Sequence, residues 1–594
     1  MLKFPYGMAD FPVLIRDGYV YIDRTQHLHD VEELGRSLLF VRPRRFGKSL
    51  WLRTLATYYD LRTAEQHGTL FGELAVGRNP TPDAHRYFVL QWDFSQVSPR
   101  GTADDVARAL NDYINTTLRN FQSDYHDHLP DLTIREDAKN TLLDVLATTR
   151  RAGHPLYLLI DEYDNFANEI MVDDEGTYSA LVHGEGPFKE LMKTVKAATQ
   201  GQGLERLFVT GVSPVVMSDL SSGMNILTDI YQRPELNALC GFHAGEVTDL
   251  LHRIREQQRP ETPVWDLEEV QDTIRDWYNG YLFSPLAKEK VYNPTMALYF
   301  LDHLSRYGQT PRQLLDANLA TDENKLRFLG GIAAGQQTLL DLLQDEAPIE
   351  IPNLEPRFTL RDLHEGSGDL TRIASFLTYF GMLTLEGEAD AYFLRLVPPN
   401  LVTRKLYVDQ VLRFLVPRDT DRNAAWPLTR ALTERGDLAP LLAFVEEKVF
   451  PTMSNRDYRW ANEHSVKVVF LTLLFNDIAY LAHSEPEVGR GYADLCLLRR
   501  FDRRSPELYD LVFEFKYLAL SDLGMAGEEL RGLDRAALEE VPLVQRRFEE
   551  AETQLRRYRV ALEERYGELR LRLYAVVALG FERLVGRELT SDEA

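Results

Sequence analysis

The chain has 594 residues, of which 44% are hydrophobic and 27% charged, a balance typical of folded protein with more than one core. Its formal net charge of −24 argues against a broad basic coat for nucleic acid, because nonspecific affinity for phosphates comes largely from Lys and Arg. A local basic channel stays compatible with that charge.

Cys240 and Cys496 have no metal-type spacing, and the N-terminal residues lack the pattern of a signal peptide. The longest apolar stretch, 466–482, is interrupted by Asn476 and predicts a buried helix, not a membrane span. We therefore expect a cytoplasmic protein.

The first chemical signal is the stretch "SLLFVRPRRFGKSLWL" (37–52), which predicts a buried strand, a basic turn and a helix. At such a turn Gly47 lets backbone N–H groups face an anion, Lys48 reaches the β/γ-phosphates, and Ser49 offers its hydroxyl to Mg²⁺. Arg42 stands where the usual pattern has its first glycine. Taken alone, the motif therefore also fits a basic turn that caps a helix.

Two later apolar strands strengthen the nucleotide interpretation. The first, "LYLLIDE" (156–162), ends in Asp161 and Glu162. An aspartate there can anchor Mg²⁺ bound to a phosphate loop, and the following glutamate can orient or deprotonate the attacking water. The second strand ends at Thr210, where ATPases with an added central strand place a polar residue near the γ-phosphate; Ser213 is the second choice. Strands that alternate with helices predict a parallel sheet with its ligand at the carboxyl ends.

In chain order, six motifs resemble those of the AAA-ATPase-like family of large, mostly bacterial proteins: "YVYIDRT" (19–25), "RPRRFGKS" (42–49), "LLIDEYD" (158–164), "FVTGVSP" (208–214), "WYNGYLF" (277–283) and "VYNP" (291–294). The family's loop characteristically reads R-P-R-R-F-G-K-S, so the resemblance accounts for Arg42. It covers residues 3–300 and implies an ATPase that uses ATP and Mg²⁺. The expected nucleotide-binding residues are Arg44, Arg45, Phe46, Gly47, Lys48, Ser49 and Thr210, with Ser49 and Asp161 on the metal and Glu162 catalytic. For "WYNGY" we expect a structural role as a packed turn.

The middle of the chain, from about 245 to 410, is mainly helical in pattern. Within it, residues 369–400 predict helix, strand, turn and strand, the layout of a winged-helix unit. Because the second helix lacks a basic face, a lid or spacer that packs on the ATPase is favoured over DNA binding.

A second chemical signal lies near the C-terminus. The stretch "ELYDLVFEFKYL" (507–518) predicts a strand that is apolar except at Glu514 and Lys516, which share one face. Asp494, on the strand predicted at 489–500, precedes Glu514 at a distance that suits a hairpin. Two carboxylates can hold Mg²⁺ while a lysine orients water and stabilises charge on phosphorus, so the set suits phosphodiester hydrolysis. A buried ion pair is the alternative.

The segments "GYAD", "FEFKY" and "EAETQLRRY" make residues 415–585 resemble the PD-(D/E)XK nuclease superfamily. Ala493 stands at the proline of the superfamily's name, a position that varies. The resemblance implies that Asp494 and Glu514 bind metal and that these two and Lys516 are catalytic. It also offers Glu463 on the preceding helix, and Gln554 and Tyr558 one helical turn apart. The basic stretch 545–559 favours a solvated helical face.

We therefore expect an α/β multidomain protein with a P-loop ATPase at 1–245, a helical lid and winged-helix-like region at 246–412, and a PD-(D/E)XK-like nuclease domain at 413–594. Its expected function is ATP hydrolysis coupled to Mg²⁺-dependent cleavage of nucleic acid, with DNA favoured. The alternative is a nucleotide-dependent switch or scaffold with an inactive nuclease-like domain, which the acidic charge supports. A setting in defence or mobile elements follows only by association, and homo-oligomers are compatible. Candidate arginine fingers are Arg44, Arg45 and Arg233.

Overall fold

The computed structural model describes residues 2–130, 133–165, 175–182, 186–214, 224–258, 260, 262–315, 323–344, 348–355, 358, 362–363, 369–387, 392–454, 462–476, 478–484, 487–488, 491–500, 506–567 and 569–589. The chain forms two compact units. Unit 1 comprises Met1–Thr310 and Pro348–Asn400, and unit 2 comprises Pro311–Ala347 and Leu401–Ala594. The region predicted at 246–412 thus contributes to both units, and the three-part division stays a prediction.

A five-stranded parallel sheet forms the centre of unit 1, with the order β2-β3-β4-β1-β5. Its strands are β1 (Ser37–Val41), β2 (Phe88–Asp93), β3 (Leu156–Asp161), β4 (Leu204–Gly211) and β5 (Thr228–Asp229). The predicted central parallel sheet is confirmed. Because β4 pairs with both β1 and β3, it lies between the strand that leads into the basic loop and the strand that ends in acid.

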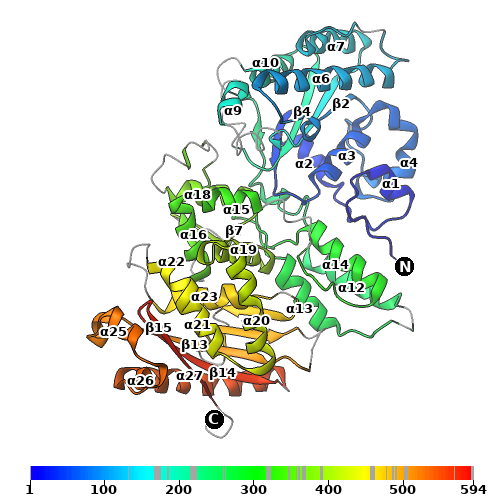
Figure 1. Cartoon of the computed structure of the whole chain (residues 1–594). Coiled ribbons are helices and arrows are strands. Elements are labelled where there is room, and N and C mark those ends of the chain that lie inside the picture. The colour runs from blue at the N-terminus through cyan, green and yellow to red at the C-terminus, as the bar shows by residue number, and fades with distance from the viewer. Residues whose placement is uncertain are drawn as a thin grey trace. The chain divides into compact units, whose positions relative to one another are not determined.

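Helices cover this sheet. Helix α3 (Lys48–Tyr59) contacts β2 and β3, α6 (Ala103–Asp124) contacts β2, and α7 (Ala138–Ala152) contacts β3. In Figure 1, α6, α7 and α10 (Pro187–Ala198) lie together beside β2 and β4. The shorter helices of this part are α1 (Phe11–Arg16), α2 (His27–Glu33), η1 (Leu61–Gln66), α4 (His67–Phe71), α5 (Ala75–Arg78), η2 (Phe94–Gln96), α9 (Glu175–Val182) and η4 (Pro234–Leu236).

The rest of unit 1 follows the predicted helical pattern. Its helices are α12 (Ala244–Glu256), α13 (Leu267–Tyr278) and α14 (Pro294–Tyr307). After them come β6 (Ile349–Ile351), α18 (Leu370–Tyr379), β7 (Thr384–Leu385) and β8 (Leu394–Val397). The predicted order of helix, strand and strand is present, and the three strands pair antiparallel in the order β6-β8-β7.

Unit 2 begins with helices: α15 (Glu323–Gly330), α16 (Ala333–Gln344), α19 (Leu401–Leu415), α20 (Asp419–Arg435), α21 (Ala439–Phe444), η6 (Val445–Val449), α22 (Phe450–Ser454) and α23 (Glu463–Leu474). The helix predicted over 466–482 is correct only to Leu474. The side chain of Asn476 accepts from the N–H of Ile478 and Ala479, which closes a turn and ends the helix. The chain then continues as β9 (Tyr480–Ser484). Among the described residues, no helix combines the length and apolar character needed to cross a bilayer.

A second five-stranded sheet, in the order β15-β14-β13-β12-β9, forms the core of unit 2. The strands are β12 (Leu495–Arg499), β13 (Asp510–Leu518), β14 (Leu571–Leu579) and β15 (Arg583–Leu589), besides β9 and the short pair β10 (Glu487–Val488) and β11 (Gly491–Tyr492). Strands β12 and β13 pair antiparallel, as the hairpin prediction required. Residues 501–505 of the predicted connecting loop lie outside the described residues.

Strands β13 and β14 run parallel, and a helical crossover joins them. It consists of α24 (Leu520–Leu523), α25 (Gly527–Gly532), α26 (Arg535–Glu539) and the long α27 (Pro542–Tyr566), which packs on β13 and β14 (Figure 1). The apolar side chains of α27 and of the sheet form one core. The predicted α/β architecture of the C-terminal region is confirmed.

Candidate functional site

The basic loop between β1 and α3 has the backbone geometry expected of an anion site. Gly47 adopts a left-handed conformation (φ 82°) immediately before α3, and Arg45 is also left-handed at φ 67°. Lys48 is buried, and its Nζ donates to the carbonyl oxygens of Arg42 and Pro43, both at 3.0 Å. Burial lowers the pKa of Lys48. Among the described residues, these two loop carbonyls are the hydrogen-bond acceptors of the Lys48 ammonium, and a phosphate oxygen can replace them.

Arg42 explains why this loop lacks its usual first glycine. The guanidinium is fully buried and donates to the carbonyls of Val41 (3.0 Å), Tyr231 (2.9 Å) and Leu236 (3.0 Å). It also lies 4.2 Å from the ring centroid of Phe283. Burial lowers the pKa of Arg42 to about 10. Arg42 therefore ties the loop to the segments that follow the sheet.

The "WYNGY" segment packs directly on the loop. Phe46 is fully buried, and its ring meets those of Tyr281 (4.9 Å between centroids) and Phe283 (5.2 Å). The Thr295 hydroxyl donates to the carbonyl of Arg45 at 2.7 Å. These contacts give the motif a structural role. They also leave only the backbone of Phe46 for the nucleotide-binding role that its place in the motif predicts.

The "YIDRT" motif is likewise structural. Arg24 forms a two-bond ion pair with Glu246, each bond 2.7 Å long, and donates to the carbonyls of Ala238 and Gly241. The segment before β1 is thereby fixed to the start of α12.

The acid pair lies beside the loop, as the sequence predicts. Asp161 is the last residue of β3 and shares a side-chain hydrogen bond with Ser49. Burial raises the pKa of Asp161, and the positive charge of Lys48 opposes that rise. Glu162 adopts φ 45°, unusual for a residue other than glycine, and burial raises its pKa too. The structure therefore brings Lys48, Ser49, Asp161 and Glu162 together.

The sequence reasoning missed a third carboxylate at this sheet edge. Asp93 ends β2 directly opposite Asp161 in the parallel register, and its charge acts on both acids of the pair. Its own oxygens accept from Ser95 and Gln96. Only the pairing of β2 with β3 shows this neighbour, because the two aspartates stand far apart in sequence.

The remaining predicted nucleotide residues differ in their surroundings. Thr210 is buried in β4, and among the described residues its hydroxyl has no hydrogen-bond partner. Ser213 is buried, and its N–H donates to Asp164 at 2.9 Å. Arg44 donates to Asn165 at 3.2 Å, and its charge acts on Glu162. Arg233 is exposed.

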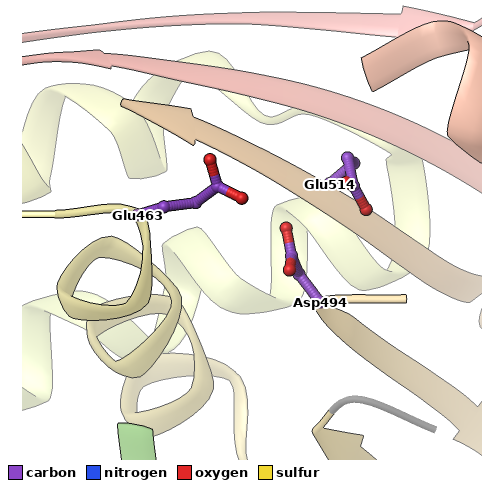
Figure 2. Close-up of side chains that lie close together, drawn as sticks. All are labelled: Glu463, Asp494 and Glu514. Carbon is purple, nitrogen blue, oxygen red and sulfur yellow. The ribbon is translucent and has the colours of Figure 1, made fainter. Parts of the chain in front are cut away.

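In unit 2, three carboxylates converge. Glu463 begins α23, Asp494 directly precedes β12, and Glu514 lies in the middle of β13. One oxygen from each lies within 4.8 Å of the other two, and Figure 2 shows the three side chains facing one another. We call these three residues the carboxylate cluster.

Lys516 completes the cluster. Its Nζ lies 2.8 Å from Glu514 Oε1 and 3.2 Å from Glu463 Oε1, so Glu514 and Lys516 do share one face of β13. Asp494 accepts from the N–H of Phe515 at 2.7 Å. Burial raises the pKa of Asp494 and of Glu514, and in Glu514 the charge of Asp494 adds to the rise. Burial alone would disfavour the charge of Lys516, but the Glu514 carboxylate raises its pKa.

The cluster fits a divalent cation. Three carboxylates are a hard-cation donor set. Glu514 Oε2 is buried and, among the described residues, has no hydrogen-bond partner, so it is an acceptor in need of one. Burial raises the pKa of Asp494 and Glu514, and a cation between the carboxylates would oppose that rise, as the charge of Lys516 already does in part. A metal ion at this point would supply both the bond and the charge.

A cavity of about 700 Å³ opens beside the cluster. Its lining includes Glu463 and Lys516 and, from α27, Arg546, Arg547, Gln554 and Arg557. Gln554 therefore lines the cavity as expected. Tyr558 is buried; burial raises its pKa, and the charges of Glu514 and Asp494 add to the rise. We call this cavity the α27 groove.

Comparison with protein families agrees with both sites. Residues 5–221 match the family described as "Predicted AAA-ATPase", and residues 461–588 match the "PD-(D/E)XK nuclease superfamily". The chain thus joins a region that matches the predicted AAA-ATPase family, called here the AAA-ATPase-like region, to one that matches the PD-(D/E)XK nuclease superfamily, called the nuclease-superfamily region. The carboxylate cluster and Lys516 lie within the nuclease-superfamily region, and the basic loop and acid pair lie within the AAA-ATPase-like region.

Individual proteins resemble the chain more distantly. The "Uncharacterized protein in vnfD 5'region" of Azotobacter chroococcum mcd 1 is 28% identical over 320 residues, which span 49% of this chain and 50% of that protein. The Walker-type ATPase paby2304 of Pyrococcus abyssi is 14% identical and covers 65% of this chain and 94% of its own, with a TM-score of 0.34. The Aeropyrum pernix ORC2 protein is 13% identical and covers 69% and 95%, with a TM-score of 0.30.

Proposed function

We propose that the chain hydrolyses ATP in unit 1 and cleaves phosphodiester bonds of nucleic acid in unit 2, with Mg²⁺ at both sites. The observation that carries the second activity is the carboxylate cluster with Lys516 and the unpartnered Glu514 Oε2. A buried ion pair alone would need neither Glu463 nor Asp494 at that point.

In the AAA-ATPase-like region, Lys48 would exchange the carbonyls of Arg42 and Pro43 for the β/γ-phosphates of ATP. Ser49 and Asp161, already joined by a hydrogen bond, would hold the magnesium. Glu162 would accept a proton from the attacking water, and burial, which raises its pKa, makes it a stronger base than an exposed glutamate. The free hydroxyl of Thr210 would contact the γ-phosphate or that water.

In the nuclease-superfamily region, Glu463, Asp494 and Glu514 would hold the metal, which would polarise the phosphoryl group and activate water. Lys516 would donate hydrogen bonds to the water or to a phosphate oxygen, which stabilises charge on phosphorus. Glu514 fixes the position of that ammonium by the 2.8 Å contact. The alternative, a buried ion pair without a metal, predicts that substitutions at these residues change stability, but it predicts no cleavage by the wild type.

The test is cleavage of plasmid, linear and single-stranded DNA and of RNA with Mg²⁺ or Mn²⁺. We expect Asp494→Asn and Lys516→Met to lower the cleavage rate about 100-fold or more. Glu528→Gln, an exposed acid of the same unit, serves as the matched control and keeps the rate. Metal binding without cleavage of any substrate by the wild type would instead favour the nucleotide-dependent switch.

A further inference from the structure

Helix α27 carries a line of polar side chains along the α27 groove. Arg546, Glu550, Thr553 and Arg557 follow one another at intervals of four, three and four residues, so they share one helix face. All four line the groove. At 1.5 Å per residue, the arginines at the two ends of this line are about 17 Å apart along the helix axis.

The line is held in place by the opposite side of the helix. Phe548, Leu555 and Tyr558 are buried in the core that α27 shares with the sheet. Strand β13 contributes Val512 to that same core, and side chains two residues apart share a strand face. Glu514 and Lys516, two and four residues after Val512, therefore project toward the α27 side of the sheet. The packing of α27 and the alternation of side chains along β13 together place this line of polar side chains next to the carboxylate cluster.

The charges along the line are unevenly paired. Glu550 forms ion pairs with Arg546 (3.5 Å) and Arg547 (2.6 Å), and Arg547 lowers the pKa of its carboxyl. Arg557 is exposed, and within the described part of the chain it has no ion pair. One end of the line is thus occupied by an internal carboxylate, and the other is open.

We propose that this line of α27 binds the sugar-phosphate backbone of a nucleic-acid strand next to the phosphate that is cleaved. Arg557 and Arg546 contact separate phosphates of that strand, and Glu550 competes with the strand for Arg546 and Arg547. The proposal rests on the proposed nuclease function and adds where the substrate strand runs. It replaces the sequence interpretation of 545–559 as only a solvated face.

Charge makes such a local site necessary. With a net charge of −24, the chain as a whole repels a polyanion, so binding requires cations concentrated at one place. The groove lining gathers three arginines and Lys516 against the carboxylates of Glu463, Glu549 and Glu550, so its local charge is positive while that of the whole chain is negative. A bound phosphate also satisfies the guanidinium geometry that Glu550 satisfies in its absence.

The test measures binding of labelled single-stranded DNA, duplex DNA and RNA by fluorescence anisotropy, with Ca²⁺ in place of Mg²⁺ to avoid turnover. Arg557→Gln and Arg546→Gln should weaken binding about fivefold to tenfold and make the slope of log K against log[salt] less negative by about one each. Glu550→Gln should tighten binding about twofold or more. Arg556→Gln is the matched control, because Arg556 is an exposed neighbour that does not line the groove. The three substrates separate DNA from RNA and single strands from duplex.

Cleavage kinetics give a second readout. Loss of a phosphate contact remote from the reacting atoms raises KM and leaves kcat unchanged, whereas a partly misfolded preparation lowers the apparent kcat and leaves KM unchanged. The proposed subsite is wrong if the wild type is active and Arg557→Gln binds and cleaves as well as the control Arg556→Gln. If Glu550→Gln binds no tighter than the wild type, the competitor role of Glu550 is wrong. A wild type that neither binds nor cleaves any substrate overturns the proposed nuclease function itself.

Discussion

At the scale of single residues, Arg42 shows how one side chain can change a phosphate loop without removing its chemistry. Its guanidinium donates to three carbonyls and lies against three aromatic rings, those of Phe40, Tyr231 and Phe283, at 4.5, 5.4 and 4.2 Å from their centroids. A glycine at this position would release all of these contacts. The loop's conformation therefore depends on Arg42 for packing and on Gly47 for backbone freedom.

This predicts that Arg42→Gly, which restores the more common motif, harms the protein. Losing several charge-assisted hydrogen bonds in a buried site should cost about 3 kcal/mol or more of stability. Because the loop's conformation depends on these contacts, ATP affinity should fall and not rise. Thermal unfolding and nucleotide binding measure the two effects, with exposed Arg36→Gly as the control. Tighter ATP binding by Arg42→Gly would contradict the structural role.

The carboxylate cluster predicts a pH-dependent response to metal. Burial raises the pKa of Asp494 and Glu514, so the folded, metal-free state holds protons that the unfolded state has released. Its stability should therefore fall as the pH rises from about 5 to 8, above the ordinary carboxyl range near 4. Bound cation requires the deprotonated form, so metal binding should strengthen over the same window.

Thermal unfolding with and without Mg²⁺ or Ca²⁺ at pH 6 and pH 8 measures this. The metal-induced rise in Tm should be clearly larger at pH 8, and Glu514→Gln should lose most of it. Lys516 stays charged throughout this range, because its raised pKa moves its titration further from neutrality. Equal rises in Tm at both pH values would show that the cluster's carboxyls are not protonated at pH 6.

At the scale of secondary-structure elements, the sequence predicts most of the strands that carry the residues of the two candidate sites. Short apolar runs predict β1, β3, β4 and β13, because buried parallel strands and hairpins leave that pattern. The same pattern cannot predict which strands become neighbours. Asp93 was therefore missed, since only the register of β2 against β3 places it beside Asp161.

Two further differences have local causes. An apolar run continued past Leu474, and only the turn closed by Asn476 separates α23 from β9. The arginines of α27 follow helical spacing, which indicates a polar face but not what that face adjoins. The strand alternation that turns Glu514 toward α27 supplies the missing information.

The turn at "WYNGY" gives a prediction for an element. Gly280 has φ 109°, and a Cβ there would lie 1.9 Å from the carbonyl oxygen of Pro399. Gly280→Ala should therefore destabilise unit 1 by about 3 kcal/mol or more and weaken ATP binding through Phe46, whose ring rests on Tyr281. Gly245→Ala is the control, because Gly245 lies in α12 with nothing near its would-be Cβ.

That control should be neutral or stabilise by about 0.5–1 kcal/mol, as alanine does in a helix. Unfolding followed by tryptophan fluorescence, with ATP titration, compares the two variants. Similar stability of both alanine variants would mean that the turn tolerates a shift of Pro399, and that the phosphate loop does not depend on this contact.

At the scale of the whole molecule, the chain combines two proposed phosphate-directed sites with a net charge of −24. The acidic charge disfavours nucleic acid away from the α27 groove, so unregulated cleavage would be limited mainly by that groove. The proposed nucleotide site on the same chain would offer a way to control access to that groove. Control of this kind requires that ATP bind two states of the protein with different affinity.

We therefore expect the nuclease rate to depend on ATP and on Lys48. In the wild type, ATP or a slowly hydrolysed analogue should change cleavage about fivefold or more, the size of a typical coupling between sites. Lys48→Ala should bind ATP weakly and cleave at one rate with or without it, because it lacks the ammonium that we propose contacts the phosphates. Arg53→Ala, which removes an exposed cation from the same helix α3, should respond to ATP like the wild type.

Thermodynamic linkage requires in return that a bound oligonucleotide change the affinity for ATP by the same factor, which a fluorescent nucleotide reports. Equal cleavage by wild type and Lys48→Ala, with and without ATP, would mean that the two sites act independently, and it would leave each hydrolytic activity to stand by itself.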